Sequence, residues 1–113
     1  MTNKQIKQII IDSCVKAREM GRVINHNFGH EYSPACCALT AVELVNFGAS
    51  KMNAGDTARE YFDWECSQRW AFIHGFDFCK GGVFAKPSLE SETFPAIFKM
   101  GKEVAAEIKP DLD

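Results

Sequence analysis

One segment of the chain, residues 57–74, combines a helix-start signal with more aromatic side chains than one helix face can hold. It opens with Thr57-Ala-Arg-Glu60, a capping box in which two side chains each bind a free backbone N–H group. One predicted buried stripe, at helical spacing, consists of Phe62, Cys66, Trp70 and Ile73. The aromatic residues left outside that stripe are Tyr61, Trp64 and Phe72. This predicted helix is therefore either central to the core or partly a contact surface.

The size and composition of the chain predict one folded domain that spans residues 1–113. Its 46% hydrophobic and 25% charged residues are close to globular averages, which argues against disorder. A chain of this length buries enough surface to fold without a metal or a disulfide. No cofactor is expected.

Charge and hydropathy exclude several classes of partner. The 13 basic and 15 acidic residues give a net charge of −2 without a basic stripe, so direct binding of nucleic acid is not expected. No segment approaches the ~20 apolar residues of a membrane span. The amphipathic N-terminal segment lacks the apolar run of a signal peptide. We therefore expect a soluble, cytoplasmic protein.

Hydrophobic periodicity predicts an all-α fold, a small bundle of about four helices. Local signals support the boundaries: Gly21 can end the first helix, Ser33 and Pro34 can start the second, and Pro110 follows the last. For residues 76–84 the pattern allows either a short hairpin or an aromatic loop. The predicted helices cover residues 3–20, 34–47, 57–75 and 93–109.

The second predicted helix is small and apolar at almost every position, and Glu43 is its single charged residue. Such a helix is predicted to be buried on several sides and to form the centre of the core. Its expected interior positions include Ala38, Ala41, Val42 and Val45.

Five cysteines, an odd number without CxxC spacing, are predicted to be free and mostly buried thiols. They are Cys14, Cys36, Cys37, Cys66 and Cys79. Cys36 and Cys37 fall in the first turn of the second predicted helix, where the positive end of the helix dipole can stabilise a thiolate.

The segment Ala35-Cys-Cys-Ala-Leu-Thr-Ala-Val-Glu-Leu-Val-Asn-Phe-Gly48 resembles the cysteine-bearing helix of papain-like hydrolases. The resemblance covers a small part of the chain and lacks the glycine-framed motif of that family. It implies a histidine base with an orienting Asn or Asp, for which His74 with Asp77, or His30, are candidates. A thiol enzyme using Cys36 or Cys37 is thus one alternative, but we favour thiols that pack as small core residues.

A metal site can also be drawn from His26 and His30, with Glu31 and Cys36 close by in the sequence. Zinc sites usually have a more regular ligand spacing, so we expect these histidines to be exposed or hydrogen-bonded without a metal.

The leading hypothesis is a small protein-binding module, acting as a regulator, adaptor or inhibitor, of a type frequent among phages and mobile elements. Eight of the 13 aromatic residues lie between Tyr61 and Phe84, a surplus for one core stripe. On a continuous helix the predicted partner-binding surface is made of Glu60, Tyr61, Asp63 and Trp64. The alternative for Trp64 is that residues 76–84 fold back and cover it, as a core residue. Its acidity suits a basic protein surface. A homodimer formed through the same aromatic face is the further alternative.

Overall fold

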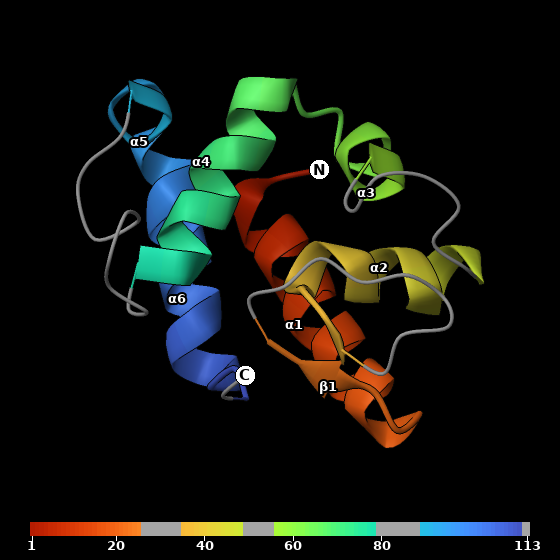
Figure 1. The fold of residues 1–113 in the computed structure, drawn as a ribbon. Helices are drawn as coiled ribbons and strands as arrows, with labels where there is room; N and C mark the ends of the chain where they lie inside the picture. Colours follow the sequence, from red (N-terminus) through yellow and green to blue (C-terminus); the bar gives the residue numbers. More distant parts are fainter. Residues whose placement is uncertain (26–34, 49–55, 79–88, 112–113) are drawn as a thin grey trace.

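The computed structural model describes residues 1–25, 35–48, 56–78 and 89–111, with the backbone alone for residues 56–58. Within these residues the fold consists of helices and one two-residue parallel strand pair (Figure 1). The predicted all-α class is confirmed. None of the described helices is long and apolar enough to cross a membrane. In chain order the elements are α1 (Asn3–Glu19), β1 (Val23–Ile24), β2 (Ala35–Cys36), α2 (Ala38–Phe47), α3 (Asp56–Tyr61), α4 (Cys66–Asp77), α5 (Leu89–Thr93) and α6 (Pro95–Ile108).

Helix α1 matches the predicted helix 3–20, and it ends just before Gly21 as expected. At its start the Thr2 hydroxyl accepts a hydrogen bond from the Gln5 N–H group at 3.2 Å, and the Gln5 side chain accepts from the Thr2 N–H group at 2.8 Å. At its end Gly21 has a φ of +88°. Gly21 and the next residue donate hydrogen bonds to carbonyls of the last turn, the arrangement that a left-handed glycine permits.

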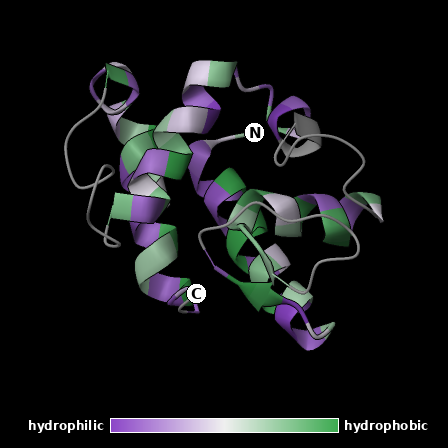
Figure 2. Cartoon of the chain, viewed as in Figure 1, coloured by the Kyte–Doolittle hydropathy of each residue, from purple (hydrophilic) through white to green (hydrophobic). Residues whose placement is uncertain are grey.

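Helix α2 lies in the core, as its composition predicts. Ala38, Ala41 and Val42 are at most 1% exposed, whereas Val45 is half-buried. The side chain of Glu43, the one charge of the helix, is also fully buried. In Figure 2, β1 and much of α2 have the colour of hydrophobic residues. The predicted centre of the core is thus confirmed for most of this helix.

The start of α2 differs from the prediction. Residues 35 and 36 form strand β2, which pairs in parallel with β1 in the register Val23 with Ala35 and Ile24 with Cys36. Asn25 continues the ladder, because its N–H group donates to the Cys36 carbonyl at 3.0 Å. Backbone groups committed to a ladder cannot also form a helical turn, so α2 begins at Ala38.

Helices α1 and α6 run in the same direction, side by side (Figure 1). The Lys7 ammonium, near the start of α1, lies 3.2 Å from a carboxylate oxygen of Glu103, just past the middle of α6. Near their ends the Arg18 guanidinium donates to the carbonyl of Ile108 at 2.7 Å. Asp111 then accepts from the Ile24 N–H group at 3.1 Å, which joins the end of the described chain to β1.

The predicted helix 57–75 is broken into two helices, α3 and α4. Its break contains Asp63, whose φ of 57° is left-handed and incompatible with a continuing helix. Helix α4 then starts afresh, since the Glu65 N–H group donates to the Gln68 side chain at 2.7 Å. The predicted stripe is divided accordingly: Phe62 and Ile73 are buried, Trp70 is partly buried and Cys66 is exposed.

Helix α6 matches the last predicted helix, with Pro95 at its first position and Pro110 just after its end. It is preceded by the short α5, which periodicity did not indicate. Residues 76 and 77 continue α4, and residues 79–84 of the expected hairpin or loop lie outside the described residues. The count within the described residues is therefore six helices, against about four expected.

Candidate functional site

A continuous series of aromatic rings leads from the surface at α2 and α3 into the core. Centroids of neighbouring rings are 5.4, 5.2, 5.3, 5.8 and 6.0 Å apart, within the range of favourable aromatic pairs. The rings follow in the order Phe47, Tyr61, Phe62, Trp64, Phe72 and Phe76. An exposed ring at the start of this series is therefore supported by the core behind it.

Phe47 and Tyr61 form the surface end of the series. Their rings meet edge to face, and they are 42% and 40% exposed, whereas the other four are at most 7% exposed. No other aromatic residue among the described ones is classed as exposed. Two large exposed rings in mutual contact are a feature that protein interfaces often use.

Two acidic residues stand close to Tyr61 in the chain. Glu60 precedes Tyr61 at the end of α3, and Asp63 follows it at the break; both side chains are exposed. Among the described residues, the arginines closest in the chain are less accessible than these carboxylates, because Arg59 is half-buried and Arg69 packs over the Trp70 ring at 5.2 Å. We call Phe47, Glu60, Tyr61 and Asp63 together the acidic–aromatic surface.

The predicted exposure of Trp64 is wrong. Its indole is 7% exposed and lies between the rings of Phe62 and Phe72. The sequence-based position assumed one helix from residue 57 to 75, and the left-handed Asp63 redirects the chain immediately before Trp64. Its neighbours Glu60, Tyr61 and Asp63 remain at the surface as expected. Phe47 was not predicted, because its place beside Tyr61 depends on how α2 and α3 pack.

The thiols of Cys36 and Cys37 lie in a different environment from the expected helix turn. Cys36 belongs to β2, and Cys37 is the N-cap residue of α2. Burial raises the pKa of Cys36 to about 11, with the neighbouring Cys37 adding to the effect. Burial also raises the pKa of Cys37, although its contact with the Thr40 hydroxyl at 3.3 Å acts in the opposite direction. Burial thus holds the pKa of both thiols above the ordinary value of 9.0, and both are protonated at neutral pH.

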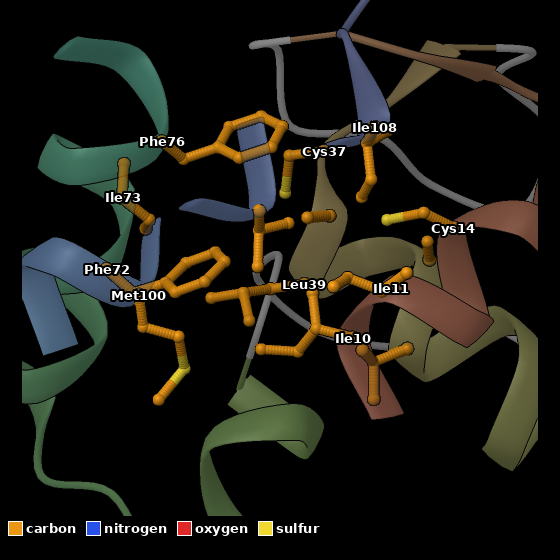
Figure 3. Close-up of a cluster of buried hydrophobic side chains, with 14 of the residues drawn as sticks. Ile10, Ile11, Cys14, Cys37, Leu39, Phe72, Ile73, Phe76, Met100 and Ile108 are labelled. Carbon is orange, nitrogen blue, oxygen red and sulfur yellow. The ribbon is translucent and has the colours of Figure 1, made fainter. Parts of the chain in front are cut away.

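The candidate base His74 has partners in α4 and α5. Its ring lies 5.8 Å from the Trp70 ring, and its Nδ1 lies 3.9 Å from a carboxylate oxygen of Glu90. Figure 3 shows Cys37 pointing into the hydrophobic cluster near Phe76. The cavity beside Cys37, which Asp77 also lines, has a volume of about 10 Å³, room for one water molecule. The described residues thus offer a substrate no space at this thiol.

The proposed metal ligands His26 and His30 lie outside the described residues. Within the part of the chain that the structure describes, no three His, Cys, Asp or Glu side chains are grouped so as to hold a metal ion.

Comparisons with models of protein families, with curated proteins and with solved structures find no match to this chain. The function proposed below therefore depends on the residues of the chain itself.

Proposed function

We propose that this protein is a small binding module that recognises another protein through the acidic–aromatic surface. The observation that carries the proposal is the exposed edge-to-face pair of Phe47 and Tyr61, with the exposed acidic residues Glu60 and Asp63 next to Tyr61 in the chain. Aromatic residues at the centre of an interface contribute most of the binding free energy, and charges at its rim select the partner.

The packing of Tyr61 against buried rings favours a binding role for this surface. The Tyr61 ring contacts Phe62 at 5.2 Å, and Phe62 is 6% exposed. A ring held by packed neighbours loses little rotamer freedom on binding, so more of the contact energy contributes to affinity. Such a surface suits a regulator, adaptor or inhibitor, including the small single-domain kind frequent among phages and mobile elements.

The chemistry of the surface supports one kind of partner. Two carboxylates beside two rings complement a basic protein surface with an apolar centre. We place this recognition in the cytoplasm, since the described cysteines are free thiols, three of them buried.

The test compares two double variants with the wild-type chain as baits in a lysate of the native cell. One variant, Phe47→Ser with Tyr61→Ser, removes the ring pair. The matched control, Val15→Ser with Met20→Ser, removes side chains that are 51% and 54% exposed elsewhere. We expect the wild type and the control to capture the same partner and the ring variant to lose it, with unchanged helical circular dichroism in all three. A partner held equally by the ring variant would place the binding surface elsewhere.

The affinity for an isolated partner provides the quantitative check. Tyr61→Ala is expected to weaken binding by about 2 kcal/mol or more, as for other aromatic residues at interface centres. Glu60→Gln should act mainly on the association rate and its salt dependence, because a rim charge steers the encounter. Titration calorimetry and stopped-flow kinetics measure the two effects.

A further inference from the structure

An open groove lies between the first turns of α1 and those of α6. Its volume is about 310 Å³. The two helices run in parallel, so both present their N-terminal ends to this region. The side chains that line it include Lys4, Lys7, Ala96, Lys99, Met100 and Glu103.

The groove is electropositive. Its one carboxylate, Glu103, lies 3.2 Å from the Lys7 ammonium, which leaves Lys4 and Lys99 as uncompensated charges among the lining residues. Neither α1 nor α6 has an acidic residue in its first turn to offset the positive end of its dipole. Ala96 and Met100 add an apolar component between the lysines. The groove therefore suits an occupant that combines carboxylates with an apolar group.

We propose that this groove binds the acidic–aromatic surface of a second copy of the chain. The proposal rests on the function proposed above and names the partner of the same surface. Glu60 and Asp63 complement Lys4 and Lys99 in sign and number, and the exposed Tyr61, which stands between the two acidic residues in the chain, supplies an apolar group for Ala96 and Met100. The net charge of −2 repels two copies at long range, so association depends on this local match of charges.

Each copy carries one groove and one acidic–aromatic surface, which determines the possible assemblies. Two copies that exchange these sites form a closed dimer, and copies joined in sequence form a chain. In either case the contact contains exposed ion pairs, so added salt weakens it. A variant with a neutralised groove still has its acidic–aromatic surface, and a variant with a neutralised surface still has its groove. Mixing the two variants should therefore restore one contact between them.

The experiment follows sedimentation velocity of the untagged protein over a range of concentrations and salt. The groove variant is Lys4→Gln with Lys99→Gln, and the surface variant is Glu60→Gln with Asp63→Asn. We expect the wild type to associate and each variant alone to do so about tenfold more weakly or not at all. An equimolar mixture should form a 1:1 complex and nothing larger, because each variant retains the site that the other lacks.

Control variants carry the same charge changes at other exposed positions. Lys16→Gln with Lys109→Gln matches the groove variant, and Asp12→Asn with Glu107→Gln matches the surface variant. Both controls should associate like the wild type. Because the changed positions are exposed, we expect equal melting temperatures across the set. A difference in association would then come from the contact between copies and not from a loss of folding.

Three results would overturn the inference: a wild type that stays monomeric at every concentration, variants that associate as tightly as the controls, or a mixture that remains monomeric. None of these results bears on capture of a foreign partner. A monomeric wild type whose ring pair still captures a protein from the lysate would remove this inference and leave the proposed function standing.

Discussion

Gly75 of α4 and Gly101 of α6 lie against each other where the two helices cross. A Cβ atom on Gly101 would come within 3.1 Å of the Gly75 carbonyl carbon and would overlap the Phe72 carbonyl oxygen. A Cβ atom on Gly75 would overlap the Phe98 carbonyl oxygen. The two helices thus pack backbone against backbone, and this close approach brings Phe72 and Phe76 to the other core residues.

Gly101→Ala is expected to destabilise the protein by about 2 kcal/mol or more, because the overlap with backbone atoms forces α4 and α6 apart. The gain in helix propensity, ~1 kcal/mol, does not offset that strain. Urea denaturation followed by circular dichroism measures the change. Glu107→Ala, on the exposed side of the same helix, serves as the control and should stay within ~0.5 kcal/mol. An equally small change for Gly101→Ala would contradict the close packing.

Trp64→Ala is expected to lower the free energy of unfolding by ~3–5 kcal/mol, since it removes a buried ring that contacts two others. Tyr61→Ala, at the exposed end of the ring series, should cost about 1 kcal/mol or less. Urea denaturation of both variants gives their free energies of unfolding, and Trp64→Ala should show the larger loss. If Trp64→Ala proved the milder of the two, Trp64 would have to be exposed in solution.

Alkaline pH is expected to destabilise the protein partly through Cys36. The ordinary pKa of this thiol is 9.0, and burial raises its pKa to about 11. Below pH 9 the thiol is neutral in the folded and unfolded chains, so its contribution to stability is complete. Between pH 9 and 11 the unfolded chain loses the proton more readily, and the free energy of unfolding falls.

The measurement is urea denaturation from pH 7 to 11 for the wild type and Cys36→Ala. One pKa unit corresponds to about 1.4 kcal/mol, so the wild type should lose at least about 1 kcal/mol more than the variant across the upper part of this range. If the free energies of unfolding of the wild type and Cys36→Ala changed equally with pH, the pKa of Cys36 would not be raised in the folded protein. The comparison is needed because Cys14 and Cys37 also have pKa values raised by burial.

Alkylation should separate the described cysteines by exposure. With iodoacetamide at pH 7.5, Cys66 on the surface of α4 should react readily, and the buried Cys14, Cys36 and Cys37 should react slowly until urea unfolds the chain. Peptide mass spectrometry at timed intervals gives the rate at each thiol. Faster labelling of Cys36 or Cys37 than of Cys66 in the folded protein would revive the thiol-enzyme alternative.

Local sequence signals predicted the outer helices correctly because the physical requirement is local. Gly21, the predicted end of α1, adopts its left-handed conformation beside hydrogen bonds that stay within residues 17–22, and the capping box of Thr2 and Gln5, which was not predicted, also lies within one turn. The apolar period of α6 likewise requires only that one face be buried. Such features can be read from a few adjacent residues.

The two wrong boundaries came from contacts between distant segments. Ser33 and Pro34 form a good helix-start signal, yet residues 35 and 36 pair with β1 and delay α2 to Ala38. Asp63 breaks the predicted helix 57–75, and Phe62 and Trp64 on either side of it enter the core. Helical periodicity describes one continuous helix, so it cannot indicate that burial of two rings favours a break.

The candidate site, too, was predicted only in part from the sequence. The sequence by itself determined that Glu60, Tyr61 and Asp63 stand close together, because they fall within four consecutive residues of the chain. Only the tertiary structure placed Phe47 beside Tyr61, buried Trp64 and raised the pKa values of the core thiols. Each of these depends on which other segments exclude water from a side chain, and that exclusion is a property of the whole packed chain.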